Sequence, residues 1–411
     1  MIYQSANAVV GQSGGPTAAI NATLAGVISG CMKSGKIEKL YGMRNGIEGF
    51  ENEDFISLYE YFKNDGEEKL SLLCATPAAA LGSCRRRVKS DEQAKLIFEI
   101  LEKYNIRYFF YIGGNDSMDT VSYLSDYAQR NSGVFDVKFI GVPKTIDNDL
   151  CMTDHTPGFG SAAKYVATMI QEIARDCSVY KVKAVTIVEI MGRDAGWLTA
   201  SAAIPAYIGN KGADYVYVPE NIFDEDVFIE SLKKDLENPE KPYIVVAVSE
   251  GIKNADGSYA GEKAMKNAVD AFGHKYLSGT GKYLENLVKE KIGCKCRSVE
   301  LNLPQRCASH IASYCDISEA FTIGSEAVGC ALSGQTGVMM AFERQKSEEY
   351  FCRIVSRKVS EIANKVKSIP SEFLSDGKIG VNNRCVQYIL PLIKGENKVE
   401  YRDGLPVHFE F

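Results

Sequence analysis

Residues 139–150 read FIGVPKTIDNDL, an apolar run that stops at a proline and is followed by one lysine, one threonine and two aspartates. A strand that ends in a polar turn presents these side chains at the carboxyl edge of a sheet, where open α/β proteins bind ligands. Asp147 is suited to accept a proton from an attacking hydroxyl, while Lys144 and Asp149 are suited to phosphate charge and a metal ion. This spacing predicts phosphoryl transfer.

A glycine-rich turn, GQSGGP at residues 11–16, follows the first apolar run and precedes a helical pattern. Such turns let backbone N–H groups approach phosphate oxygens, and the helix start adds a favourable dipole. The same letters match the G-x-S-x-G turn of serine hydrolases around Ser13, or an ordinary strand-to-helix turn. The hydrolase alternative is disfavoured because that turn belongs after several strands, and no acid and histidine are clearly placed to complete a triad.

Three more motifs end apolar runs with polar residues: GGNDS at 113–117, MGRD at 191–194 and SEG at 249–251. Oxygens of Asn115 and Asp116 suit a hard cation, although Ser117 could simply cap the next helix. Arg193 suits a sugar hydroxyl or a phosphate, and as an isolated residue it would equally be a surface charge. Glu250, next to a glycine at a strand end, is well placed to hold a sugar hydroxyl. Two arginines nine residues apart, Arg297 and Arg306, are further candidates.

The bulk composition bounds the function. The 411 residues are 45% hydrophobic, which predicts a globular protein of two lobes with a cleft between them. The net charge of −6 gives no basic field for nucleic acid or a membrane surface, and no apolar run reaches the length of a membrane span. A local cluster, Arg85, Arg86, Arg87 and Lys89, suits an anion. Twelve cysteines without a signal peptide predict reduced thiols in a cytoplasmic protein.

Short apolar runs alternate with longer helical patterns, which predicts an α/β fold with parallel sheets flanked by helices. The expected strands are 7–10, 39–43, 107–112, 137–142, 184–190, 215–218, 243–248 and 337–341. The expected helices are 18–32, 91–104, 117–129, 161–176 and 311–332. A polar insertion around 253–291 and a tail after Arg344, expected to be helical, add length without a functional interpretation.

Taken together and in this order, GGNDS, PKTIDND, MGR and SEG resemble the phosphofructokinase family, specifically its diphosphate-dependent branch. The resemblance runs from Gly11 to about Leu332. It implies two lobes, each a mainly parallel sheet flanked by helices, with the active site in the cleft between them. The phosphoryl-donor lobe would comprise 1–160 and about 305–345. The sugar-phosphate lobe would comprise 161–304 and about 346–411.

The resemblance implies transfer of a phosphoryl group from diphosphate to the 1-hydroxyl of fructose 6-phosphate, reversibly, with Mg²⁺, in glycolysis or sugar synthesis. Gly15 would contact the donor, Arg85 would steady the transferring phosphate, and Asp147 would be the catalytic base. Thr145 would hydrogen-bond near the sugar and phosphoryl groups. The metal would lie near Asn115, Asp116 and Asp149. The sugar phosphate would contact Thr145, Ile146, Asp147, Met191, Gly192, Arg193, Glu250, Arg297 and Arg306.

Two positions predict the donor, because ATP-using relatives generally have glycine where this chain has Asp116 and Lys144. A carboxylate at Asp116 would repel the α-phosphate of ATP, since two unit charges about 4 Å apart repel by about 4 kcal/mol at an effective dielectric near 20. Diphosphate has no third phosphate, and Lys144 would neutralise charge on the transferring group. The alternative is an ATP-dependent enzyme that tolerates both residues.

Several positions depart from the family pattern. Asn115 stands where many relatives have a metal-binding aspartate, and Leu303 replaces a histidine or tyrosine of the sugar-phosphate site. Ala184 sits where an arginine of a neighbouring subunit often reaches the 6-phosphate. Ala25 and Ser29 replace two arginines of the effector site in allosteric relatives, so nucleotide regulation there is not expected. A homodimer or homotetramer is implied, and a non-catalytic regulatory subunit that binds sugar phosphate is the alternative from another class.

Overall fold

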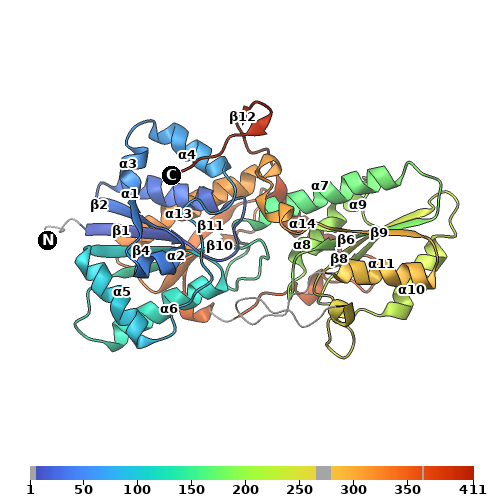
Figure 1. Ribbon diagram of the computed structural model, residues 1–411, viewed down its shortest axis with the longest axis horizontal. Coiled ribbons are helices and arrows are strands. Elements are labelled where there is room, and N and C mark those ends of the chain that lie inside the picture. The colour runs from blue at the N-terminus through green and yellow to red at the C-terminus, as the bar shows by residue number, and fades with distance from the viewer. Residues whose placement is uncertain (1–5, 265–278, 363–364) are drawn as a thin grey trace.

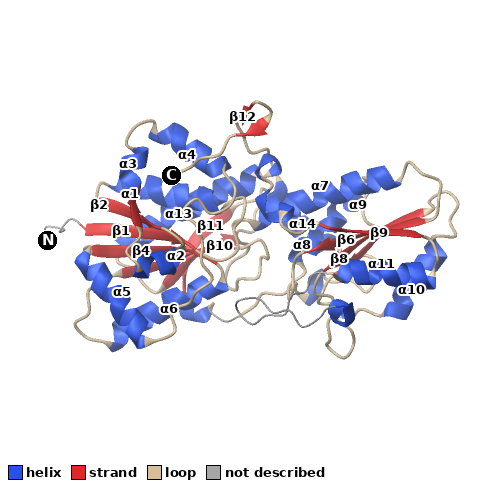
Figure 2. Cartoon of the chain, in the orientation of Figure 1, coloured by secondary structure: helices blue, strands red, loops and turns tan. Residues whose placement is uncertain are grey.

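The computed structural model describes residues 6–264, 279–362 and 365–411 of the chain. Two lobes lie side by side along the longest axis of the molecule (Figure 1). Each lobe contains one large sheet with helices on both of its faces, as the expected α/β architecture requires (Figure 2).

The first lobe contains a seven-stranded sheet in the order β11-β10-β5-β4-β1-β2-β3. Its five inner strands are parallel, and the two edge strands, β3 and β11, pair antiparallel with their neighbours. In the centre, Val10 pairs with Phe110 on one side and with Gly42 on the other. The strands are β1 (Ala6–Gln12), β2 (Ile37–Met43), β3 (Phe55–Ser57), β4 (Ile106–Gly113), β5 (Lys138–Pro143), β10 (Val338–Arg344) and β11 (Cys352–Lys358).

Helices cover both faces of this sheet. On one face lie α1 (Ile20–Ser34), α3 (Leu58–Phe62), α4 (Gly66–Ala75) and α13 (Tyr314–Leu332). On the other face lie α2 (Gly46–Glu51), α5 (Asp91–Lys103) and α6 (Asn115–Arg130). Helices α1 and α13 pack so closely that a Cβ on Gly26 would lie 1.9 Å from the carbonyl oxygen of Phe321. Ala25 and Ser29 are buried on α1, so the positions of the two effector-site arginines do not face solvent.

The second lobe contains a four-stranded parallel sheet in the order β7-β8-β6-β9. Its strands are β6 (Ala184–Ile190), β7 (Tyr215–Tyr217), β8 (Tyr243–Ser249) and β9 (Lys295–Glu300). One face carries α7 (Phe159–Cys177), α8 (Trp197–Ala200), α9 (Ile204–Tyr207) and α14 (Asn383–Ile389). The other face carries α10 (Glu225–Asp235) and α11 (Thr280–Lys291), and α12 (Pro304–Cys307) follows β9. Every residue of β8 is buried, as expected for a strand covered on both faces.

All eight expected strands are present, but the sequence did not predict β3, β9, β11 or the short antiparallel pair β12 (Tyr401–Arg402) and β13 (Leu405–Pro406). Strands β9 (KCRSVE) and β11 (CRIVSRK) carry several charged residues and lie at sheet edges, so neither shows the apolar run of an inner strand. The polar insertion ends in α11, whose Leu284 and Val288 pack on the second sheet. Residues 265–278 of that insertion lie outside the described part of the chain.

The prediction of a helical tail after Arg344 is wrong. The tail begins with β11, which joins the sheet of the first lobe and not the second lobe, and its one α-helix in the described residues is the short α14. The end of the chain then returns to the first lobe. There the ring of Phe409 stacks on the ring of Phe62, with 5.5 Å between the ring centroids. The assignment of 346–411 to the sugar-phosphate lobe therefore fails for β11 and for the chain end.

The twelve cysteines are all free thiols, as expected. Within the described ranges, the helices are too short or too polar for any of them to cross a membrane.

Candidate active site

A cavity of about 750 Å³ lies where the strand ends of the two lobes face each other. In the first sheet β1 lies between β4 and β2, so the chain reverses its winding direction there and leaves a crevice beyond the strand ends. Turns after β1, β4, β5, β6 and β8 all reach this crevice. Of the residues predicted from sequence, the following line it: Gly15, Arg85, Asn115, Asp116, Lys144, Thr145, Ile146, Asp147, Asp149, Met191, Arg193, Glu250 and Arg306.

The glycine-rich turn after β1 is crossed by two cationic side chains. Gly14 has a φ of 77°, which glycine adopts without strain, and a Cβ there would lie 3.2 Å from Lys144 Nζ. A Cβ at Gly15 would lie 3.3 Å from Nη1 of Arg306. The absence of side chains therefore lets an ammonium and a guanidinium group approach the backbone, which makes this turn an anion-binding surface.

Lys144 follows β5 directly and is only 3% exposed. Its Nζ donates a hydrogen bond to the carbonyl oxygen of Gly15 at 2.7 Å. Burial lowers the pKa of Lys144 to about 8, while the carboxylates of Asp147 and Asp149 act in the opposite direction. The ammonium group is therefore mostly charged at neutral pH and is held against the glycine turn.

Asp147 is held by the residue two positions before it. The Thr145 hydroxyl donates to Asp147 Oδ2 at 3.3 Å, and the Asp147 backbone N–H donates to Thr145 Oγ1 at 3.2 Å. Burial raises the pKa of Asp147, and the nearby Lys144 ammonium limits that rise. A buried carboxylate with a raised pKa is a better proton acceptor than an exposed one, which suits a general base.

The oxygens that would hold a cation follow the ends of β4 and β5, on Asn115 at the start of α6 and on Asp149 in the loop after β5. Asn115 Nδ2 lies 3.5 Å from Asp149 Oδ2, and no described group hydrogen-bonds to the buried Oδ1 of Asn115. Burial and the neighbouring Asp147 raise the pKa of Asp149. An amide oxygen without a partner beside a desolvated carboxylate fits a hard divalent cation.

Asp116 is not a free carboxylate. Arg87 binds Asp116 through Nη2, at 2.5 Å from Oδ1, and Asp119 through Nη1, at 2.9 Å from Oδ2. Sequence reasoning placed Arg87 in a basic cluster but did not predict this pairing. The available signal was the i,i+3 spacing of the two aspartates, which puts them on one face of α6.

The second lobe contributes the opposite wall. The Gly192 N–H donates to Glu250 Oε1 at 3.2 Å, so the turns after β6 and β8 are joined. Gly192 has a φ of 135°, and a Cβ there would lie 2.6 Å from the carbonyl oxygen of Ala195. Burial raises the pKa of Glu250 to about 7. The Met191 N–H donates to Gln305 Oε1 at 3.3 Å, which ties this wall to α12.

Arg297 is not brought into this cavity. It lies on β9 and lines a separate pocket with Ala184, Tyr180 and Lys295. Leu303, another departure from the family pattern, is 52% exposed.

Ser13 does not form a nucleophile site. It is buried, and its hydroxyl donates to the carbonyl oxygen of Cys84 at 3.4 Å. No histidine is among the described residues that line the cavity. The geometry of a serine hydrolase triad is therefore missing around Ser13.

Sequence reasoning missed several lining residues. Tyr259 comes from the polar insertion, and Lys365 and Val366 come from the tail, two regions that had no functional interpretation. The sequence held no signal for them because they reach the cavity through contacts between segments far apart in the chain.

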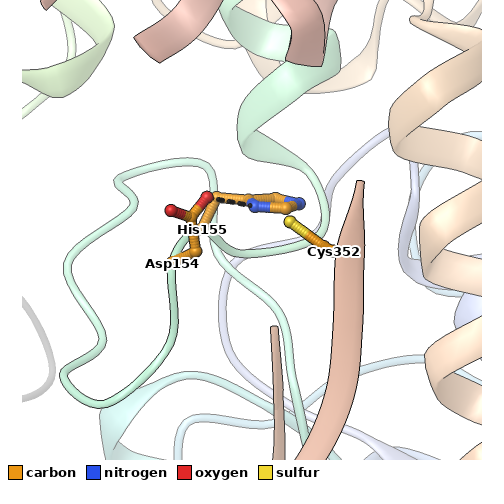
Figure 3. Close-up of side chains that lie close together, drawn as sticks. All are labelled: Asp154, His155 and Cys352. Atoms are coloured by element: carbon orange, nitrogen blue, oxygen red, sulfur yellow. Dashed lines mark hydrogen bonds and ion pairs between the residues drawn. The ribbon is translucent and has the colours of Figure 1, made fainter. Parts of the chain in front are cut away.

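Asp154, His155 and Cys352 form a second group of side chains that could hold a metal ion (Figure 3). Both ring nitrogens of His155 are occupied, Nδ1 by Asp154 Oδ1 at 2.9 Å and Nε2 by Glu319 Oε2 at 2.8 Å. The nearby carboxylates raise the pKa of His155 well above its usual value. A histidinium with two carboxylate partners explains this group without a metal ion.

Comparisons with known proteins identify the family of this chain. The phosphofructokinase family model matches residues 7–363. Relatives named pyrophosphate–fructose 6-phosphate 1-phosphotransferase are 36% identical in Halomonas elongata and 38% identical in Xanthomonas campestris pv. campestris, each over 97% of this chain and 94% of its own. The crystal structure of a pyrophosphate-dependent phosphofructokinase from Nitrosospira multiformis superimposes with a TM-score of 0.85, at 35% identity, over 99% of this chain and 96% of its own. The chain therefore belongs to the phosphofructokinase family.

Proposed function

We propose that the protein is a diphosphate-dependent 6-phosphofructokinase. It transfers a phosphoryl group from diphosphate to the 1-hydroxyl of D-fructose 6-phosphate and yields fructose 1,6-bisphosphate and phosphate. The observation that carries the proposal is the joint placement of Lys144, Asp116 and the glycine turn in one cavity with Asp147. The names of the most similar relatives support the same reaction.

Diphosphate binds at the strand ends of the first lobe. Gly15 offers its backbone to the terminal phosphate, and Arg85 and Lys144 balance its charge. Asp116, held by Arg87, closes the space that a third phosphate would need. The donor is therefore limited to two phosphates.

Fructose 6-phosphate binds against the second lobe. Met191, Gly192 and Glu250 form a joined wall for the sugar hydroxyls, and Arg193 and Arg306 are suited to the 6-phosphate. Thr145 and Ile146 complete the pocket near the reacting hydroxyl. In this position the 1-hydroxyl lies next to the carboxylate of Asp147.

Asp147 accepts the proton of the 1-hydroxyl as its oxygen attacks the terminal phosphorus of diphosphate. Lys144 and Arg85 stabilise the charge on the phosphoryl oxygens and on the departing phosphate. Because the donor and the product bond are similar in energy, the reaction runs in both directions and serves glycolysis or sugar synthesis.

Asn115 Oδ1 and the carboxylate of Asp149 would hold a divalent cation, Mg²⁺ in our proposal, with Asp116 close by. When bound, it supplies positive charge to the diphosphate oxygens.

The 6-phosphate pocket also involves a second copy of the chain. Arg297 lies outside the cavity and shares its pocket with Ala184, the position where relatives carry an arginine that reaches a neighbouring subunit. We propose a homo-oligomer in which Arg297 reaches the sugar phosphate of the partner subunit. Twelve free thiols are consistent with a reduced compartment, so we place this enzyme in the cytoplasm.

The test is turnover of fructose 6-phosphate with diphosphate and with ATP at matched concentrations. Turnover with diphosphate and little with ATP is expected, and equal or faster turnover with ATP would overturn the donor assignment. The absence of turnover with either donor would favour a regulatory subunit, although Asp147, Arg85 and Gly15 are all retained in this chain.

A further inference from the structure

A short segment of the tail, residues 365–369, runs between the two lobes; we call it the bridging segment. The Lys367 N–H donates to the carbonyl oxygen of Asp149 in the first lobe at 2.7 Å. The Trp197 indole N–H of the second lobe donates to the Lys367 carbonyl oxygen at 2.9 Å. The bridging segment therefore joins the loop after β5 to α8, and two of its residues, Lys365 and Val366, line the cavity.

The side chain of Lys367 spans the loop that carries the predicted base. Its ammonium donates to Asn148 Oδ1 at 3.1 Å, to Thr153 O at 3.2 Å and to Asp154 O at 2.7 Å. It also lies 5.3 Å from the centre of the Trp197 ring, within the range of a cation–π interaction. All three donor positions of one ammonium group are thus used to fix a single loop.

Asn148 is the residue through which this loop is held. It is fully buried and has a φ of 54°, a left-handed conformation that asparagine tolerates better than most residues. Its Oδ1 accepts from Lys367, and its Nδ2 donates to the Tyr388 hydroxyl at 3.0 Å. The same hydroxyl donates to Asp154 O at 2.5 Å. Both ends of the amide are therefore fixed, directly between Asp147 and the predicted metal ligand Asp149.

We propose that Lys367 is a positioning residue for phosphoryl transfer, which acts with Tyr388 through Asn148 to hold the Asp147 carboxylate in its reactive orientation. The inference rests on the proposed function for its effect on turnover. It assigns a role to a tail segment that touches the cavity wall and both lobes. Because a displacement of about 1 Å in a reacting group lowers rates about 100-fold, a brace at this loop controls kcat more than substrate binding.

The test compares Lys367→Met with Lys398→Met, an exposed lysine of the same tail. Methionine is an unbranched apolar side chain of similar length, so this change removes the ammonium and little else. We expect kcat to fall about 100-fold in Lys367→Met, with both KM values within roughly threefold of wild type, and no change in Lys398→Met. A normal kcat in a folded Lys367→Met enzyme overturns the proposal. A loss of kcat that is fully accounted for by the fraction of unfolded protein, measured by circular dichroism, overturns it as well.

Tyr388→Phe provides a milder second variant because it removes only the hydroxyl. Both side chains act through Asn148, so the double variant Lys367→Met, Tyr388→Phe should have a kcat little lower than that of Lys367→Met alone. A fold-loss in the double variant equal to the product of the two single fold-losses would contradict a common action through Asn148.

Hydrogen–deuterium exchange of residues 147–154 gives a measure independent of turnover. We expect faster exchange in Lys367→Met and in Tyr388→Phe, and no change in Lys398→Met. Unchanged exchange in the first two variants overturns the proposal, whichever reaction the wild-type enzyme catalyses. Faster exchange in an enzyme that does not use diphosphate would instead defeat only the proposed reaction.

Discussion

Arg87 and Asp116 form an ion pair at the edge of the cavity, with Arg87 Nη2 2.5 Å from Asp116 Oδ1. The carboxylate that we propose to exclude ATP is therefore partly neutralised. Its repulsion of a third phosphate is weaker than the value of about 4 kcal/mol for two unpaired charges about 4 Å apart. The ion pair also fixes the carboxylate in place, so we expect exclusion of ATP to depend on occupied volume as well as on charge.

Replacement of both Asp116 and Lys144 by glycine should change the donor. If pairing with Arg87 halves the repulsion to about 2 kcal/mol, kcat/KM for ATP should rise roughly 30-fold. The value for diphosphate should fall, because Lys144 no longer balances the transferring phosphate. Steady-state kinetics with each donor measure both changes.

The matched control for that variant is Asp126→Gly, which introduces glycine at an exposed position of the same helix. It should leave the ratio of the two donors unchanged. An unchanged ratio in the Asp116 and Lys144 double variant would mean that other residues select the donor.

Replacement of Asp147 by alanine should abolish most turnover without preventing binding. Removal of a positioned general base lowers kcat by about 10²- to 10⁴-fold, and the KM for fructose 6-phosphate should change far less. Asp136→Ala is the control, since Asp136 is an exposed carboxylate just before β5. Near-normal kcat in Asp147→Ala would refute the assigned proton acceptor.

The strand-end motifs were predictable because parallel strands bring their carboxyl ends to one edge, wherever they lie in the sequence. This rule alone united Gly15, Asn115 and Lys144 in one cavity. The buried apolar runs that precede these residues were equally clear, since inner parallel strands are covered on both faces.

Other parts of the site could not be predicted, because they depend on contacts without a local pattern. Lys367 reaches Asn148 across 219 positions, and Arg87 reaches Asp116 from a loop with no regular period. Edge strands such as β11 carry charges on an exposed side and resemble loops in sequence. The tail was therefore assigned to the wrong structure, although it supplies part of the cavity wall.

The activity should decline in alkaline solution because of Lys144, whose pKa is lowered to about 8 by burial. The ammonium is charged below this pH and loses its proton above it, so kcat/KM for diphosphate should fall as the pH rises past about 8. The alkaline decline of kcat should occur at a higher pH than the decline of kcat/KM, because bound diphosphate favours the charged form of the Lys144 amine. The Lys144→Met enzyme should turn over slowly and should show no alkaline decline of kcat/KM. The same decline in that variant would mean that a group other than Lys144 causes it.

The affinity for fructose 6-phosphate should weaken in mild acid because of Glu250, whose pKa burial raises to about 7. Above this pH the ionised carboxylate accepts hydrogen bonds from sugar hydroxyls through both oxygens, and below it one oxygen carries a proton. KM for fructose 6-phosphate should therefore rise as the pH falls from 8 to 6, roughly tenfold if one charge-assisted hydrogen bond is lost.

The phosphate of the sugar has a pKa near 6 and also affects binding in this range, so Glu250→Gln separates the two effects. The glutamine variant should show a raised KM at pH 8 that changes little down to about pH 7, because only the phosphate still titrates. If the variant keeps the full wild-type dependence between pH 8 and 7, the ionisation belongs to a group other than Glu250.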